Sequence, residues 1–317
     1  MIILSSPPTL PFMLIQGDLM RRLLMMRCFP ALLLSLVLLP LANAAEEATS
    51  GKVKQRTEVY KTIGDVQLTM HIFEPADHTP KSKSPAIVFF FGGGWSSGSP
   101  KQFFPHCELL AEQGMVAMAA DYRVASRHQV TADACVADAK SAIRWTRANA
   151  ERLGIDPNRI VAGGGSAGGH LAACTAAIDG FDEPNEDAKV SSRPNALVLF
   201  NPAVMLASEK GLPPAVQKRM EGLAKRMGTE PVNLSPYHHL HDKMPPTIIF
   251  HGKADTTVPY LTVERYAEKM QELGCLCKLV GYEDAAHGFF NQGRGDNSAY
   301  KDTTKQMTQF LRDQGYL

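Results

Sequence analysis

Short, continuously apolar runs alternate with helix-like stretches along most of this chain, and that alternation limits the folds it can adopt. The runs 86–91, 115–120 and 196–200 contain no polar residue. Such strands are typical of a parallel sheet covered on both faces, whereas a half-exposed strand alternates apolar and polar residues. Helical stretches between successive strands are the pattern of βαβ units. We therefore predict an α/β fold with a mostly parallel central sheet and helices on both faces.

The predicted elements follow one another in a regular order. An opening strand pair is expected within residues 45–84, where 66–73 alternates as a half-buried strand does. The strands expected after it are 86–91, 115–120, 159–162, 196–200, 247–250 and 275–282, and the expected helices are 101–114, 131–152, 167–178, 214–227, 259–273 and 298–314. A longer connection at 203–241 is interpreted as a small insertion over the carboxyl edge of the sheet. Since no internal repeat occurs, residues 45–317 are predicted to form a single domain that includes this insertion.

The residues before this domain have the pattern of a secretory signal. Three arginines between residues 21 and 27 precede the apolar run 29–41, and the small-x-small tripeptide 42–44 follows. The run is shorter than the roughly 20 residues that a membrane-spanning helix needs, and an N-terminal membrane anchor is the alternative interpretation. We expect residues 1–44 to comprise an N-terminal extension and a signal peptide. The mature protein would then be exported, periplasmic or secreted, without stable membrane insertion.

The charge balance and the cysteine pattern exclude several partners. The 33 Lys and Arg residues nearly match the 32 Asp and Glu residues, so the formal net charge is +1. This balance provides no basic surface for nucleic acid. Because the Cys and His residues lack the spacing of a zinc site, we expect neither a metal nor an organic cofactor. Cys107 and Cys135 fall in successive predicted helices, and the sequence leaves open whether they pair or remain buried thiols. It does not indicate an oligomeric state.

A serine flanked by glycines lies at the junction between a strand and a helix. The pentapeptide 164–168 has the form G-x-S-x-G with Ser166 at its centre. Glycines on both sides allow the tight turn that pushes such a serine out of the sheet edge. A dinucleotide-binding loop is the alternative, because residues 163–168 also match G-x-G-x-x-G. That motif follows the first strand of a βαβ unit, whereas several strands precede this one, so we favour a nucleophilic serine.

A nucleophilic serine needs a base and an acid, and candidates for both occur at later strand ends. His287 follows the last predicted strand, and Asp255 lies five residues beyond the strand 247–250. The histidine would take the hydroxyl proton, and the carboxylate would orient the imidazole and stabilise its cation. The chain order Ser, Asp, His is typical of this topology. Glu283 and Asp284 are alternative acids, less favoured because they precede the histidine too closely.

A glycine-rich turn provides a site for the negative charge that forms during acyl transfer. Gly92-Gly93-Gly94 follows the strand 86–91, and without side chains this backbone can approach a carbonyl oxygen closely. We predict an oxyanion hole formed by the amides of Gly93, Gly94 and Ala167, the residue after the serine.

These motifs resemble those of the α/β-hydrolases of the hormone-sensitive-lipase type, close to secreted bacterial esterases and acetyl-xylan-esterase-like enzymes. The resemblance covers roughly residues 60–316. The segments that carry it are Phe91-Gly92-Gly93-Gly94-Trp95, Asp121-Tyr122-Arg123, Gly164-Gly165-Ser166-Ala167-Gly168-Gly169-His170, His251-Gly252-Lys253-Ala254-Asp255 and His287-Gly288-Phe289. It implies an α/β-hydrolase fold with Ser166 as nucleophile, His287 as base and Asp255 as the acid that orients it.

Two features depart from that family pattern. The histidine that usually precedes the three glycines, and holds their loop by hydrogen bonding, is Phe91 here, so the support of the loop is in question. The insertion 203–241 can roof a pocket over the active site but is too short to match the lid of true lipases. Trp95 and Phe289 are expected to border that pocket, and core packing explains each of them equally well.

The resemblance implies a serine esterase that hydrolyses short-chain carboxylic esters through an acyl-enzyme. Together with the expected export, it suggests acetyl groups on carbohydrates, so the substrate would be a small-molecule or oligosaccharide ester. Hydrolysis of amide or peptide bonds, as by a formamidase or a peptidase, is the alternative that uses the same triad. A non-enzymatic binding protein is disfavoured because all three triad positions are filled.

Overall fold

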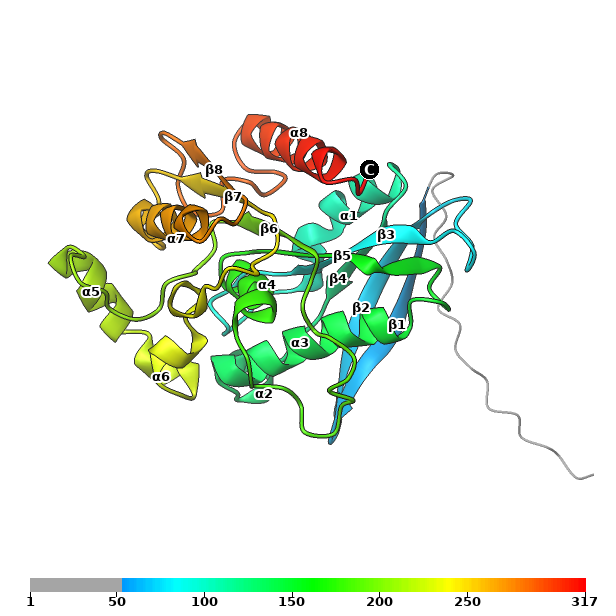
Figure 1. Cartoon of the computed structure of the whole chain (residues 1–317), viewed down its shortest axis with the longest axis horizontal. Coiled ribbons are helices and arrows are strands. Elements are labelled where there is room, and N and C mark those ends of the chain that lie inside the picture. The colour runs from blue at the N-terminus through cyan, green and yellow to red at the C-terminus, as the bar shows by residue number, and fades with distance from the viewer. Residues whose placement is uncertain (1–52) are drawn as a thin grey trace, which may run out of the picture. The chain divides into compact units, whose positions relative to one another are not determined.

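The computed structural model describes residues 53–317, which are built on an eight-stranded sheet (Figure 1). The strands are β1 (Val53–Ile63), β2 (Val66–Pro75), β3 (Ser84–Phe90), β4 (Val116–Ala120), β5 (Ile155–Gly165), β6 (Ala196–Phe200), β7 (Thr247–Gly252) and β8 (Cys277–Tyr282). Their order in the sheet is β1-β2-β4-β3-β5-β6-β7-β8. β2 pairs antiparallel with β1 and β4, and every other neighbouring pair is parallel. The predicted mostly parallel sheet is confirmed.

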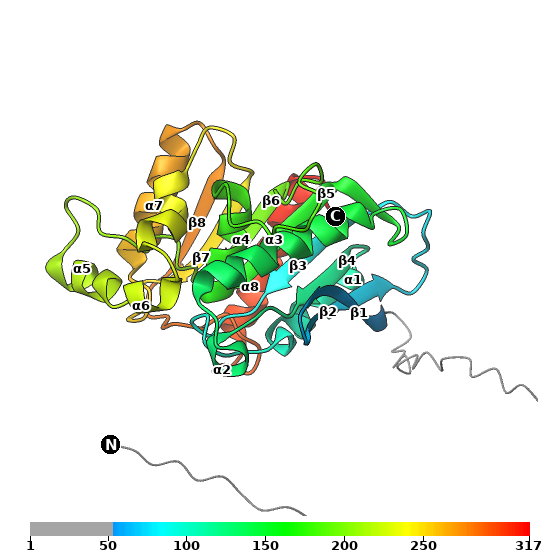
Figure 2. The same cartoon turned by 90° about the horizontal axis from the view of Figure 1, so that it is seen from below.

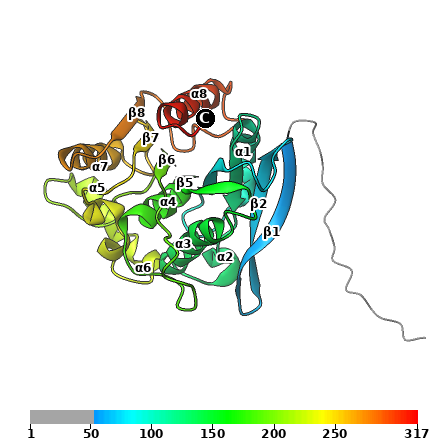
Figure 3. The same cartoon turned by 45° about the vertical axis from the view of Figure 1, so that its right-hand side comes forward.

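Helices cover both faces of this sheet. The helices are α1 (Phe104–Ala111), α2 (Ala125–His128), α3 (Ala132–Ala148), α4 (Ala167–Ala177), α5 (Pro214–Glu221), α6 (Ala224–Met227), α7 (Tyr260–Glu272) and α8 (Ser298–Asp313), with 3₁₀ turns η1 (Pro100–Phe103), η2 (Pro231–Leu234) and η3 (Pro236–His239). Figures 1 and 2 show α1 and α8 on one face and α3, α4 and α7 on the other. In Figure 3, β1 and β2 form the edge of the sheet away from β7 and β8.

The side chains of β3 alternate between two hydrophobic cores, one on each face. Val88 and Phe90 pack in the core that contains residues of α3, α4 and α7. Ile87 and Phe89 pack in the core that contains residues of α1 and α8. Because both faces of the strand are covered, successive side chains are all buried, and this explains the continuous apolar run seen in the sequence.

The elements differ from the prediction in a few places. The helix expected at 214–227 is two short helices, α5 and α6, which are separated at Gly222, a residue with low helix propensity. The strand expected at 159–162 begins at Ile155, because it continues pairing with β3 through an irregularity in register. The short helix α2 was not predicted.

The described cysteines are all free and buried, namely Cys107, Cys135, Cys174, Cys275 and Cys277. Cys107 lies in the core with α1 and α8, and Cys135 lies in the core with α3, so the sheet separates the two thiols. The predicted extension and signal peptide at 1–44 lie outside the described residues. Within 53–317, no helix is apolar and long enough to cross a bilayer, and no three His, Cys, Asp or Glu side chains cluster as metal ligands would.

A fully buried histidine, His106, lies on α1 and packs among aromatic side chains. Neither ring nitrogen of His106 has a hydrogen-bond partner among the described residues, and its ring packs against Phe103, Phe200 and Tyr300 at centroid distances of 5.1, 5.3 and 5.1 Å. Burial lowers the pKa of His106 to about 3, whereas an unfolded histidine has a pKa of about 6.5. Between these values the unfolded chain binds a proton that the folded chain does not, so folded stability decreases as the pH falls through this window.

We expect His106→Phe to remove this part of the acid sensitivity. Below about pH 6, the free energy of unfolding of the wild-type protein should fall by up to about 1.4 kcal/mol per pH unit more than that of the variant. Urea unfolding at neutral pH and at two acidic pH values measures both slopes. Parallel slopes in the two proteins would show that His106 does not contribute to acid unfolding.

Candidate active site

Ser166 lies on the sharp turn between β5 and α4, at the carboxyl edge of the sheet. Its φ and ψ angles are 54° and −118°, a backbone conformation that costs energy for a residue other than glycine. A Cβ on Gly168 would lie 2.0 Å from the carbonyl oxygen of Phe90, and one on Gly164 would lie 2.5 Å from the backbone of Gly168. The glycines of the G-x-S-x-G motif therefore allow α4 to pack directly against the strands, which holds Ser166 in its strained conformation.

The structure brings His287 and Asp255 to this serine. His287 Nε2 lies 2.9 Å from Ser166 Oγ, and His287 Nδ1 lies 2.6 Å from Asp255 Oδ2. In this arrangement Nδ1–H can donate to the carboxylate while Nε2 accepts the proton of the serine hydroxyl. The residues come from the ends of β5, β7 and β8, which meet at one edge because these strands are parallel.

The carboxylate of Asp255 is buried and remains ionised. Its Oδ1 accepts hydrogen bonds from the backbone N–H groups of Thr257 at 2.8 Å and Val258 at 2.9 Å. Burial raises the pKa of the Asp255 carboxyl, but the hydrogen bonds from His287 and Val258 oppose burial and leave the pKa below its usual value. A negative charge is therefore fixed beside the imidazole at neutral pH, where it orients the ring and can stabilise an imidazolium formed when a serine hydroxyl gives up its proton.

The two alternative acids do not take part in this arrangement. Glu283 Oε1 lies 2.5 Å from Lys253 Nζ in an ion pair, and Asp284 is exposed. Neither carboxylate has a hydrogen bond to His287 within the described part of the chain.

The glycine loop that follows β3 runs beside the serine. A Cβ on Gly92 would lie 3.3 Å from the Cβ of Ser166. Gly93 and Gly94 have left-handed φ angles of 132° and 61°, and within residues 53–317 their N–H groups donate to no protein acceptor. Ala167 is the first residue of α4, where an N–H has no partner inside the helix. These amides are available to bind a developing oxyanion.

The two loop glycines differ in the room around them, and this gives a test of the loop. A Cβ on Gly93 would lie 2.0 Å from the carbonyl oxygen of Ser97, whereas one on Gly94 meets only Arg226, at 3.5 Å. We expect Gly93→Ala to displace the loop and lower kcat by about 10²–10³. Gly94→Ala, the matched control with a positive φ angle but free space, should lose no more than about tenfold. Steady-state kinetics with melting curves measures both, and equal losses would contradict the assignment.

Phe91 supports the loop by stacking, in the position where the resembled family carries a histidine. Its ring stacks on Tyr122 with centroids 4.1 Å apart, and Tyr122 Oη donates to the carbonyl oxygen of Phe91 at 2.8 Å. The next residue, Gly92, donates its N–H to Gln102 Oε1 at 2.6 Å. The sequence analysis missed Gln102, since it belongs to no motif and no pattern along the chain connects it with the loop.

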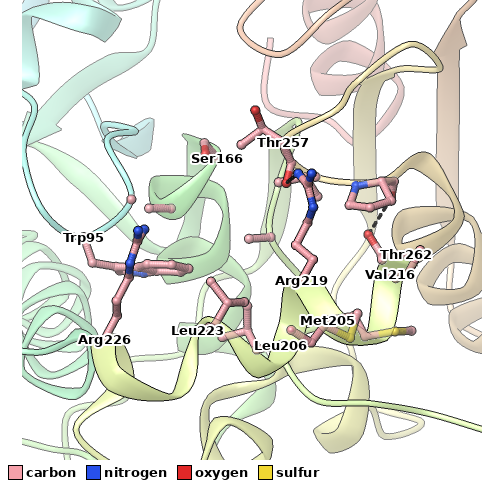
Figure 4. A pocket seen from close by; sticks show the side chains of 16 residues that line it. Trp95, Ser166, Met205, Leu206, Val216, Arg219, Leu223, Arg226, Thr257 and Thr262 are labelled. Carbon is pink, nitrogen blue, oxygen red and sulfur yellow. Dashed lines mark hydrogen bonds between the residues drawn. The ribbon is translucent and has the colours of Figure 1, made fainter. Parts of the chain in front are cut away.

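A cavity of about 110 Å³ opens beside Ser166 (Figure 4). Apolar side chains from the segment between β6 and β7 line much of it, namely Met205, Leu206, Val216, Met220 and Leu223. The insertion predicted at 203–241 therefore contributes one wall of the cavity. Figure 4 shows Arg226 beside Trp95 and Arg219 beside Thr257 at the margin, where Arg219 Nη1 donates to the carbonyl oxygen of Thr257 at 2.8 Å.

Only one of the two expected pocket aromatics lines this cavity. Trp95 does, and its Nε1–H donates to Nδ1 of the buried His170 at 3.0 Å. Burial lowers the pKa of His170 to about 4, so the ring is neutral and can accept this bond. Phe289 does not line the cavity, because its ring packs against Tyr282 and Phe290 in the core on the α8 face.

Comparison with known families and sequences gives a consistent result. Residues 70–270 match the BD-FAE family. Esterase LipC of Mycobacterium tuberculosis is 27% identical over 222 residues, which cover 66% of this chain and 54% of LipC. The probable isoprenylcysteine α-carbonyl methylesterase ICMEL1 of Arabidopsis thaliana is 30% identical over 226 residues, which cover 66% of this chain and 47% of that protein. The chain thus spans about half the length of these curated relatives.

Solved structures of an esterase are more similar. The apo form of Thermogutta terrifontis esterase 2 is 55% identical, with a TM-score of 0.79, and the match covers 83% of this chain and 96% of that one. The propionate-bound structure of the same esterase is 54% identical with a TM-score of 0.78, and the match covers 83% of this chain and 95% of that one.

Proposed function

Because this chain belongs to the BD-FAE family of hormone-sensitive-lipase-like α/β-hydrolases, we propose that it is a carboxylic ester hydrolase whose catalytic residues are Ser166, His287 and Asp255. One observation carries the proposal: Ser166 Oγ, His287 and Asp255 Oδ2 are joined by hydrogen-bond distances of 2.9 and 2.6 Å at one edge of the sheet. Serine, base and orienting acid in this order are the requirements of nucleophilic acyl transfer.

The proposed reaction has two halves. Ser166 Oγ attacks the ester carbonyl carbon while His287 Nε2 takes the hydroxyl proton, and the amides of Gly93, Gly94 and Ala167 stabilise the oxyanion. The tetrahedral intermediate collapses, the C–O bond to the alcohol breaks, and His287 returns its proton to the leaving alkoxide. Water then attacks the acyl carbon and gives a proton to His287. The bond between the acyl carbon and Ser166 Oγ breaks, His287 returns the proton to Oγ, and the carboxylic acid is released.

We further propose that the acyl group is short. A cavity of about 110 Å³ is smaller than an engineered protein cavity of about 150 Å³ that binds benzene. The similar esterase of Thermogutta terrifontis has been solved with propionate and with butyrate bound, which supports the same size class. Acetyl groups on carbohydrates are the proposed natural form of the substrate. The sequence pattern at 21–44 supports export of the enzyme to a compartment where such polymers occur.

Hydrolysis of p-nitrophenyl esters with acyl chains of two to twelve carbons tests this proposal. We expect kcat/KM to be largest for the short esters and to fall as the chain outgrows the cavity. Leu223 lines the cavity, so Leu223→Ala should enlarge the cavity and move the acyl-chain length with the largest kcat/KM toward longer chains. Leu276→Ala, at an exposed position, should not change that length. Equal kcat/KM values for all acyl-chain lengths would contradict the proposal that the cavity limits the acyl group to a short chain. Faster cleavage of the matching anilides would favour an amidase.

A further inference from the structure

Two side-chain amides connect the glycine loop with the loop that carries His287. Gln102 Oε1 accepts a hydrogen bond from the N–H of Gly92 at 2.6 Å, and Gln102 Nε2 donates to Asn291 Oδ1 at 2.9 Å. Asn291 Nδ2 in turn donates to the carbonyl oxygen of Gly288 at 2.8 Å. Gly288 directly follows His287, so three hydrogen bonds join the two halves of the active site.

The direction of every bond in this series is determined by its ends. A backbone N–H can only donate and a backbone carbonyl can only accept, so Gln102 must present its oxygen to Gly92 and Asn291 must present its nitrogen to Gly288. The bond between the two side chains then runs from Gln102 Nε2 to Asn291 Oδ1. Only a residue that both donates and accepts fits either position, and carboxylates, apolar chains and ammonium groups do not.

Neighbouring contacts hold both ends of the series. Gln102 lies on η1, whose first residues are capped by Ser99, since the Ser99 hydroxyl accepts a hydrogen bond from the N–H of Lys101. At the other end, the N–H of Gly288 donates to Asn201 Oδ1 at 3.0 Å. Both backbone groups of Gly288 are therefore bonded, the carbonyl by Asn291 and the N–H by Asn201, which limits rotation of the residue after His287.

We propose that Gln102 and Asn291 act as one pair of positioning residues that sets the distance between the oxyanion loop and His287. The glycine loop lacks the histidine that the resembled family carries before its three glycines, because Phe91 occupies that position. Gln102, on η1, instead accepts a hydrogen bond from the loop through the N–H of Gly92. Catalysis requires the oxyanion amides and His287 to be placed correctly around the same carbonyl carbon. A displacement of either group by about 1 Å can lower the rate by about 10². This inference rests on the proposed ester hydrolysis.

Four variants of the full chain test the pair. Gln102→Met removes both bonds of Gln102, and Gln102→Glu retains an acceptor for Gly92 but removes the donor to Asn291. Asn291→Leu removes both bonds of Asn291. Lys101→Met, at an exposed position on the same turn, is the matched control. We expect Gln102→Met and Asn291→Leu each to lower kcat on p-nitrophenyl acetate by about 10–10² with KM changed less than about twofold, and Lys101→Met to keep wild-type kinetics.

The double variant Gln102→Met/Asn291→Leu gives the decisive measurement. If the residues act as one unit, its loss in kcat will match the larger single loss and will not be the product of the two. A trifluoromethyl ketone forms a tetrahedral adduct with Ser166 that resembles the intermediate of the proposed reaction. Its inhibition constant should rise by the same factor by which kcat/KM falls. Gln102→Glu should show an intermediate loss and serves as a second probe if Gln102→Met does not fold.

Several outcomes would overturn the proposal. Multiplicative losses, a rise in KM with kcat unchanged, or variants of Gln102 that retain wild-type kcat would each show that the pair does not position the catalytic groups. These results require an active wild-type enzyme. An inactive wild-type protein would instead contradict the proposed ester hydrolysis, so the two failures are distinguishable.

Discussion

Replacing Ser166 by alanine is expected to abolish ester turnover, with kcat for p-nitrophenyl acetate falling by about 10⁴–10⁶. In the proposed mechanism the Oγ atom forms the bond to the acyl group, and no other hydroxyl among the described residues is hydrogen-bonded to His287. Residual activity would come from the oxyanion amides and from substrate binding alone. Alanine experiences the same positive φ angle as serine at this turn, so we expect the melting temperature to change little. Kinetics and thermal unfolding of the purified variant provide the measurement.

Two controls make that result specific. Ser97→Ala, at an exposed position of the glycine loop, should keep wild-type kcat. Paraoxon phosphorylates serine hydroxyls that a histidine activates, and His287 Nε2 lies 2.9 Å from Ser166 Oγ, so we expect paraoxon to inactivate this protein with one equivalent of p-nitrophenolate released. Mass spectrometry should locate the adduct on Ser166. An Ser166→Ala protein that retained turnover, or was still labelled in the active site, would refute the nucleophile assignment.

Replacing Asp255 by asparagine is expected to lower kcat by about 10⁴ while the fold persists. The asparagine oxygen can still accept the N–H groups of Thr257 and Val258. Its amide N–H₂ then faces His287 Nδ1, which favours the tautomer with the proton on Nε2. That tautomer points an N–H at Ser166 and cannot accept the hydroxyl proton.

The pH dependence of this loss follows from the state of the carboxyl. Because the pKa of Asp255 lies below its usual value, the wild-type residue is charged throughout the range above about pH 5. Titration of residue 255 should therefore add no pH dependence of its own to the ratio of wild-type to variant kcat above about pH 5. Asp284→Asn, which changes the exposed neighbouring acid, should leave kcat unchanged. A large effect of Asp284→Asn with a small effect of Asp255→Asn would reverse the assignment.

The sheet and the three candidate catalytic residues could be predicted from the sequence because both are encoded locally. A strand covered on both faces is apolar along its buried length, and β6 and residues 86–90 of β3 show this directly. The serine and its glycines are consecutive, since close packing of α4 excludes side chains at Gly164 and Gly168. The histidine and aspartate follow strand ends at positions that a parallel sheet brings together.

The amide pair could not be predicted in this way. Gln102 and Asn291 are 189 residues apart, and neither belongs to a motif or to a periodic pattern. Their contact depends on the path of two loops, which no local propensity specifies. The break between α5 and α6 was missed for a similar reason: a single glycine in a helix-like pattern is tolerated in many helices, and here the surrounding packing decides.

One wall of the cavity and the candidate catalytic residues come from different parts of the chain, and this separation has an evolutionary consequence. Met205, Leu212 and Met220 form a small hydrophobic cluster of their own in the segment between β6 and β7, apart from the two cores that hold the sheet and its helices. Met205 and Met220 line the cavity, so substitutions of these two residues would alter the space beside Ser166 without removing a side chain from the core that contains α4. Selectivity for the acyl group can therefore diverge among descendants of such a chain through substitutions at these few positions, while the proposed chemistry is inherited intact.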